Sequence, residues 1–161
     1  MGIPIVLVDR EVSGLDVDSA AVDNYYGAYE IMNHLIDLGH RNIGYIDRKT
    51  YMSHSIAQRQ GYINALTDHG IDVKETNICA ANGYDYDAGY DAAHDLLTTN
   101  PSLTAIFGYY DVMAFGAMRA AIDLGYKVPE DISFAGYDGM PFTQSSNPRL
   151  TTVFFPTAEL A

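Results

Sequence analysis

Acidic and aromatic side chains follow several short apolar runs of this sequence. They are Asp9, Asp47, Tyr84, Tyr109, Tyr110, Asp111, Tyr137 and Asp138. If the apolar runs are parallel strands, these side chains lie at the carboxyl edge of one sheet, where open α/β sheets bind ligands. Carboxylates accept hydrogen bonds from hydroxyl groups, and aromatic rings stack on sugar rings. The set predicts a site for a neutral polyhydroxylated ligand, and acidic strand ends also suit a magnesium or phosphoacceptor site.

Motifs for nucleotide, metal and nucleophile chemistry are absent from the sequence. No apolar run is followed by GxGxxG or GxxxxGK[ST]. The histidines lack the spacing of a metal site, and no Gly-x-Ser-x-Gly turn occurs. We therefore predict that the chain is not an enzyme and holds no metal or other cofactor.

Strands and helices that would position these residues alternate along the chain. Apolar runs predict strands over Ile3–Val8, Ile43–Ile46, Asn77–Ala80, Ala105–Phe107, Ile132–Ala135 and Thr151–Phe154. Helical spacing predicts helices over Tyr25–Leu38, Ile56–Asp68, Ala88–Thr98 and Val112–Leu124, with another beginning after Thr157. Asp111 is expected to cap the fourth helix. This alternation without hairpin signals predicts an α/β fold with a parallel sheet of βαβ units.

The composition limits the partners and location of the chain. With 9 Lys and Arg against 21 Asp and Glu, the net charge is −12, which argues against contact with nucleic acid or an anionic membrane. No apolar run reaches the ~18–20 residues of a membrane span. The single cysteine, Cys79, suits a reducing compartment, so we expect a cytoplasmic location. Because the chain begins on an apolar strand and ends at a helix start, we expect a fragment of a larger protein.

Eight phrases resemble the effector-binding domain of the lactose/galactose repressor (LacI/GalR) family of bacterial transcription regulators. They are Pro4–Arg10, Val22–Ala28, His34–Ile43, Gln60–Leu66, Asp111–Ala117, Val128–Ser133, Gly136–Asp138 and Pro148–Val153. The resemblance implies a periplasmic-binding-protein-like type I fold, whose two α/β lobes close on a ligand. It also implies that residues 1–40 belong to the amino-terminal lobe, 41–138 form the carboxy-terminal lobe, and 139–161 cross back to the first lobe.

The resemblance also implies a set of ligand-binding residues. Asp138 matches an aspartate that accepts hydrogen bonds from ligand hydroxyl groups, and Tyr84 lies where the family often places an aromatic ring. Asp9 matches a strand-end aspartate that lines the cleft. Asp111 matches an aspartate that caps a helix, so we expect its first role to be structural.

Three positions depart from the family pattern. Gln58 stands where the family usually has an arginine that binds the ligand, and Arg59 comes one position later. One position on a helix is ~100° of rotation, so Arg59 cannot simply replace that arginine. Tyr110 replaces a common asparagine or aspartate, and His54 is a candidate contact at a position that is often small and polar. Loss of the arginine favours a neutral ligand.

The resemblance implies a parent protein that regulates transcription. A sugar or another small polar metabolite would bind between the lobes and change DNA affinity through a helix-turn-helix outside this chain, in a homodimer without membrane contact. One alternative is an exported sugar receptor for transport or chemotaxis. A second is an α/β enzyme or phosphoacceptor domain, in which Asp9, Asp47, Asp111 and Asp138 would converge on magnesium.

Apolar surface is expected at two segments of the amino-terminal part. The strand over Ile3–Val8 and the helix over Tyr25–Leu38 would lack their neighbouring strands. We therefore expect self-association through that edge, or disorder of residues 1–40 and 148–161 around a folded 41–138 core.

Overall fold

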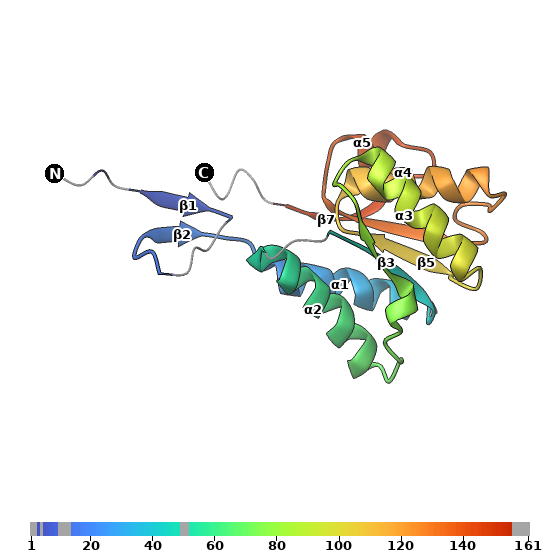
Figure 1. The fold of residues 1–161 in the computed structure, drawn as a ribbon, viewed down its shortest axis with the longest axis horizontal. Coiled ribbons are helices and arrows are strands. Elements are labelled where there is room, and N and C mark those ends of the chain that lie inside the picture. The colour runs from blue at the N-terminus through green and yellow to red at the C-terminus, as the bar shows by residue number, and fades with distance from the viewer. Residues whose placement is uncertain (1–2, 4, 10–13, 49–51, 156–161) are drawn as a thin grey trace.

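A five-stranded parallel sheet forms the centre of the molecule. The structure is a computed structural model that describes residues 3, 5–9, 14–48 and 52–155. The sheet has the order β4-β3-β5-β6-β7 (Figure 1). Its strands are β3 (Ile43–Arg48), β4 (Ile78–Ala81), β5 (Ala105–Gly108), β6 (Ser133–Asp138) and β7 (Thr151–Phe154). The predicted α/β fold with a parallel sheet is confirmed.

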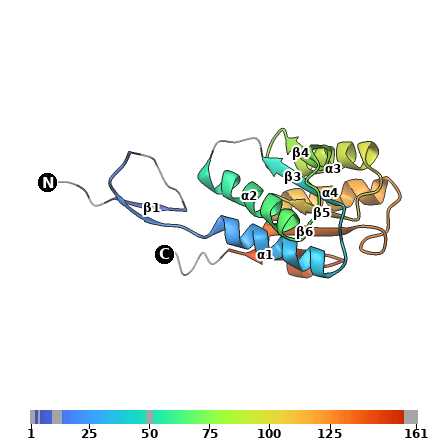
Figure 2. The ribbon, with the colours of Figure 1, turned by 90° about the horizontal axis from the view of Figure 1, so that it is seen from below.

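Two pairs of helices cover the two faces of this sheet. Helices α1 (Asn24–Asp37) and α2 (Ser53–Asp68) pack together on one face, and α3 (Tyr86–Thr99) and α4 (Asp111–Asp123) on the other (Figures 1 and 2). The backbones of α3 and α4 approach closely at two glycines. A Cβ atom on Gly89 would collide with the backbone of Met113, and one on Gly116 with the carbonyl oxygen of Tyr86.

The predicted elements agree with the structure except at their ends and in three short segments. Helix α2 begins three residues earlier than predicted, at Ser53, and β6 continues to Asp138. Sequence reasoning missed β2 (Asp18–Ala20), the 3-10 helix η1 (Glu75–Asn77) and the helix α5 (Phe142–Ser145). Segments of three or four residues are too short to show hydrophobic periodicity. The helix predicted after Thr157 lies outside the described residues.

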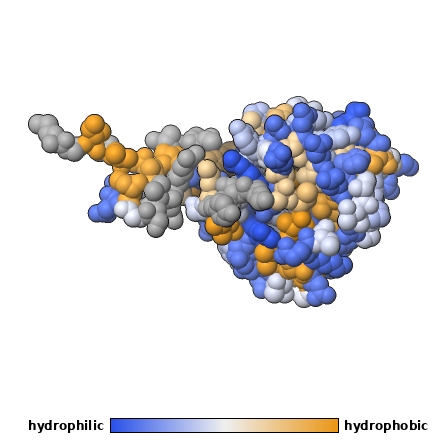
Figure 3. Space-filling model, in the orientation of Figure 1, coloured by the Kyte–Doolittle hydropathy of each residue, from blue (hydrophilic) through white to orange (hydrophobic). Residues whose placement is uncertain are grey.

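Strands β1 (Val6–Val8) and β2 form a separate parallel pair. In Figure 1 this pair stands apart from the main body, on the side toward which β7 runs. Apolar side chains of β1 are open to solvent, since Val6 is 59% and Val8 54% exposed. The space-filling view shows them as an apolar extension of the molecule (Figure 3). The expected apolar exposure of the first strand is confirmed, but the expectation that it lacks a neighbouring strand is wrong, because β1 pairs with β2.

Helix α1 and strand β7 both pack with the main body of the molecule. The apolar face of α1 is buried against α2 and β7, and Ala28 and Met32 are fully buried in the common core. Strand β7 pairs with β6 in the five-stranded sheet. Helix α1 therefore packs with the 41–138 segment, and the expectation that it exposes its apolar face is wrong. The position of α1 near the start of the sequence does not determine which sheet this helix covers.

Candidate functional site

Two aspartates at strand ends have an unusual backbone conformation. Asp9 follows β1 with a φ of 53°, and Asp138 ends β6 with a φ of 116°. They are the only non-glycine residues with positive φ in the described part of the chain. Positive φ costs energy for a residue with a side chain, and such strain concentrates at functional sites. Both residues were predicted to line the cleft.

The carboxyl group of Asp138 lies in a half-buried and acidic setting. Burial, followed by the charges of Asp111 and Asp9, raises its pKa to about 7. The charges of Asp111, at the start of α4, and of Asp9, after β1, therefore act on the carboxyl group at the end of β6.

Asp9 lines a cavity of about 340 Å³ between the β1–β2 pair and the starts of α1 and α2. Its backbone N–H donates to the carbonyl oxygen of Ala20 at 2.7 Å. Its Oδ1 atom is buried and has no hydrogen-bond partner among the described residues. His54 also lines this cavity, and its ring centroid lies 6.3 Å from that of Tyr109. The cavity therefore joins two of the predicted site residues.

Gln58 and Arg59 have opposite surroundings on α2. Gln58 is 1% exposed, and its Oε1 atom has no hydrogen-bond partner in the described part of the chain. The guanidinium of Arg59 instead forms ion pairs with Asp47, at 3.9 Å, and Glu75, at 3.2 Å. Arg59 therefore does not substitute for the arginine that the family has at the position of Gln58. Its guanidinium is already ion-paired with two carboxylates. Asp47, which is buried, serves this ion pair rather than an open edge.

Asp111 is a structural residue, but it does not cap its helix as expected. Tyr110 occupies the N-cap position, without a side-chain cap, and Asp111 is the first residue of α4. Its carboxylate accepts hydrogen bonds from the N–H of Met140, at 2.7 Å, and from the hydroxyl of Thr152. Burial raises the pKa of Asp111, and these hydrogen bonds oppose that rise. The side chain thus joins α4 to the turn after β6 and to β7.

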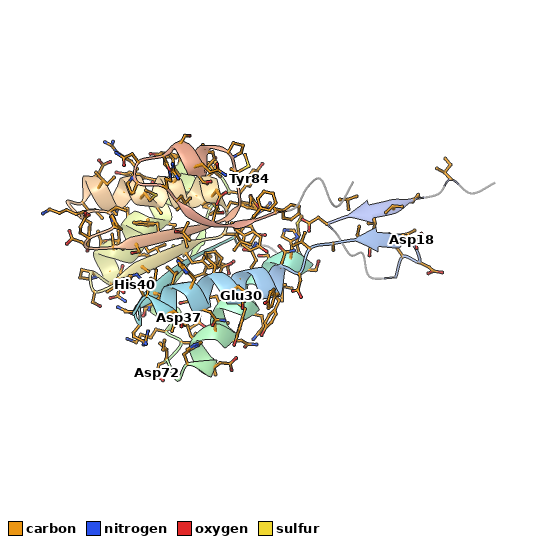
Figure 4. The ribbon with its side chains drawn as sticks, turned by 180° about the vertical axis from the view of Figure 1, so that it is seen from behind. Asp18, Glu30, Asp37, His40, Asp72 and Tyr84 are labelled. Carbon is orange, nitrogen blue, oxygen red and sulfur yellow. The ribbon has the colours of Figure 1, made fainter. Side chains whose placement is uncertain are left out.

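The aromatic part of the carboxyl edge is built from two loops and one strand end. Tyr84 is 61% exposed (Figure 4), and the guanidinium of Arg48 lies 4.8 Å from the centre of its ring. Arg48 also donates to the hydroxyl of Tyr110 at 3.4 Å, and Tyr110 packs edge-on against Tyr109 at 4.4 Å. Sequence reasoning missed Arg48. The sequence feature that could have identified Arg48 is a basic residue at the end of an apolar run in a strongly acidic chain.

The arrangement does not favour the magnesium alternative. Among the residues described, no three His, Cys, Asp or Glu side chains are grouped so that they could hold a metal ion. Asp47 is paired with Arg59, and Asp111 with Thr152 and Met140. In the same described ranges, no helix is long and apolar enough to span a membrane.

Comparisons with known proteins agree with this architecture. The model of the periplasmic binding protein-like domain matches residues 32–161. The transcriptional repressor PurR of Yersinia pestis is 36% identical over 159 residues, which are 98% of this chain and 46% of PurR. The chain thus spans about half the length of the curated relatives it matches. These relatives are regulators rather than enzymes, in agreement with the prediction that this chain is not an enzyme.

Solved structures of transcription regulators also resemble this chain. The transcriptional repressor ascG of Escherichia coli superposes with a TM-score of 0.88 at 28% identity, covering 98% of this chain and 57% of that one. A LacI-family regulator of Enterococcus faecium with bound ribose also has a TM-score of 0.88 at 28% identity, covering 98% and 58%. The chain therefore belongs to the periplasmic binding protein-like domain family, in the form found as the effector domain of LacI/GalR-type transcription regulators.

Proposed function

We propose that this chain is the part of a bacterial LacI-type regulator that senses a sugar or another small polar metabolite. The observation that carries the proposal is that the strand ends of two different sheets each carry an aspartate with positive φ, Asp9 and Asp138. The charge of Asp9 also acts on Asp138. A ligand whose hydroxyl groups donate hydrogen bonds to both carboxylates would hold the two sheets in one arrangement.

The polar groups of the site support a neutral, hydroxyl-rich ligand. Asp9 and Gln58 offer buried oxygen atoms without protein partners in the described residues, and such atoms are costly unless a ligand or water binds them. The exposed ring of Tyr84 offers an apolar face for a sugar ring. One of the similar structures holds ribose, which is a ligand of this chemical class.

Regulation of the parent would follow from a difference in affinity. A ligand shifts a protein between two states only by binding one of them more tightly. In the parent, which we propose to be a cytoplasmic homodimer, the favoured arrangement of the lobes would set the position of DNA-binding segments outside this chain. The net charge of −12 argues against DNA contact by the chain itself.

A thermal melt against a panel of ligands tests the proposal. The panel contains monosaccharides, disaccharides, nucleosides and magnesium, because binding to the folded state raises the midpoint in a concentration-dependent manner. We expect one saccharide to raise the midpoint, and Asp138→Asn to weaken that rise. A rise with nucleosides alone would replace the sugar by a nucleoside, and a rise with magnesium alone would contradict the proposal. A cooperative melt that no compound shifts would contradict ligand recognition by this chain alone.

A further inference from the structure

We infer that Arg48 determines which ligand this cleft accepts, by donating hydrogen bonds to two neighbouring oxygen atoms of the ligand. The inference rests on the proposed function, because it concerns the same cleft. Arg48 is the last residue of β3, and β3 lies between β4 and β5 in the sheet. Its side chain therefore emerges at the carboxyl edge, between the segments that carry Tyr84 and Tyr110.

The charge of Arg48 is not neutralised within the described residues. Arg59 is paired with Asp47 and Glu75, and Arg119 with Asp123. The structure gives Arg48 no ion pair among the residues it describes, although the side chain is half-buried. A partly buried cation without a carboxylate partner is unfavourable in the free protein and is available to a ligand.

Most of the hydrogen-bonding capacity of Arg48 is also unused. A guanidinium carries five N–H donors. The contacts described for this one are the ring face of Tyr84 and a long hydrogen bond, 3.4 Å, to the hydroxyl of Tyr110. The remaining donors form a planar fork, which matches two oxygen atoms held side by side.

The two tyrosines hold this fork in place before a ligand binds. Stacking on Tyr84 restricts the plane of the guanidinium, and the bond to Tyr110 restricts its rotation. Tyr110 is itself packed against Tyr109, which is fully buried. A side chain that is already oriented loses less conformational entropy on binding, so its hydrogen bonds contribute more to selectivity.

Two kinds of ligand present such a pair of oxygen atoms. One is a neutral sugar with adjacent hydroxyl groups, and the other is a sugar acid with a carboxylate. In both cases the remaining hydroxyl groups of the ligand can donate hydrogen bonds to acceptors elsewhere in the cleft. Gln58 is neutral, so in either case Arg48 supplies the positive charge.

The test compares three variants of the chain with neutral sugars and the corresponding uronic and aldonic acids. Arg48→Gln removes the fork and the charge, Arg48→Lys keeps the charge and the donors of a single nitrogen but not the fork, and Arg119→Gln is a control at an exposed arginine of α4. Each variant is first melted without ligand, to show that it folds. Affinity for the compound that raises the wild-type midpoint is then measured by titration at low and high salt.

We expect Arg48→Gln to weaken binding by about tenfold or more, as for the loss of a hydrogen bond from a charged group, and Arg119→Gln to bind as the wild type does. If the acceptors are hydroxyl groups, Arg48→Lys loses as much affinity as Arg48→Gln. If they are a carboxylate, Arg48→Lys loses less, and wild-type affinity falls with salt.

One result overturns the inference and leaves the proposed function intact. This is wild-type affinity in Arg48→Gln, which would show a ligand site that does not use Arg48. If no sugar, sugar acid or nucleoside raises the midpoint of the wild-type chain, the proposed function fails for this chain, and the inference fails with it.

Discussion

Asp138 binds its proton more tightly in the folded chain than in an unfolded one. Its pKa is raised from 3.8 to about 7, first by burial and then by the charges of Asp111 and Asp9. Between these two pH values the folded state binds more protons than the unfolded state. The free energy of unfolding therefore falls as the pH rises through this window.

Asp138→Asn should remove this part of the pH dependence. Urea unfolding at pH 5 and pH 8 measures it. We expect wild type to be less stable at pH 8, and the variant to lose less stability between the two values, because the asparagine side chain is neutral throughout. Asp72→Asn, at an exposed site shown in Figure 4, should keep the wild-type dependence. Equal dependence in wild type and Asp138→Asn would contradict the raised pKa.

Asp111 should matter for stability rather than for ligand contact. Replacing it by alanine leaves the N–H of Met140 and the hydroxyl of Thr152 without their acceptor. Two hydrogen bonds to a charged group contribute about 3–6 kcal/mol, so the free energy of unfolding should fall by about that amount. Urea unfolding measures this, with Asp123→Ala on the same helix as a control that should change little. A stable Asp111→Ala chain would refute the structural role.

At the scale of elements, the interface between α3 and α4 depends on two glycines. Gly→Ala in a helix normally stabilises a protein by about 1 kcal/mol. At Gly116 the added Cβ would collide with the backbone of Tyr86, which cannot rotate away as a side chain can. We therefore expect Gly116→Ala to lower the free energy of unfolding, whereas helix propensity alone would raise it.

Thermal melting of Gly116→Ala tests the packing of these helices. Overpacking in a tight interface costs about 1–3 kcal/mol, so the midpoint should fall by several degrees. Asp91→Ala, at an exposed position of α3, is the control and should leave the midpoint nearly unchanged. A midpoint above that of wild type would show that α3 and α4 lie farther apart than in this structure.

The main strands and helices were predictable because each carries its own local signal. β7 was predicted with its observed ends, and α1 to within one residue at each end. β2 could not be predicted, because Asp18-Ser19-Ala20 has no strand pattern and forms a strand only by pairing with β1. The prediction that Asp111 caps its helix was wrong, because the groups that donate hydrogen bonds to it, on Met140 and Thr152, are distant in the sequence.

At the scale of the whole molecule, the apolar side chains of the β1–β2 pair are exposed to solvent rather than packed against helices. Two-stranded sheets are marginally stable in water by themselves. The exposed apolar side chains of this pair, Ile5, Val6 and Val8, form a surface that a second copy of the chain can cover.

We expect the chain to self-associate through this surface. Sedimentation analysis over a range of concentrations should show a species larger than a monomer, and the double variant Val6→Lys, Val8→Lys should shift it toward monomer. Leu38→Lys changes an equally exposed residue at the end of α1, and it should leave the association unchanged. A monodisperse wild-type monomer at all concentrations would contradict the expectation.

The sequence by itself determined the α/β alternation, the family resemblance and the aspartates and tyrosines of the carboxyl edge. These features depend on local periodicity and on residues next to one another in the chain. Only the tertiary structure decided that α1 packs with the five-stranded sheet, that Arg59 is held by Asp47 and Glu75, and that Arg48 lies over Tyr84. The reason is physical: the direction of a side chain and its partners depend on contacts between segments that are far apart in the sequence.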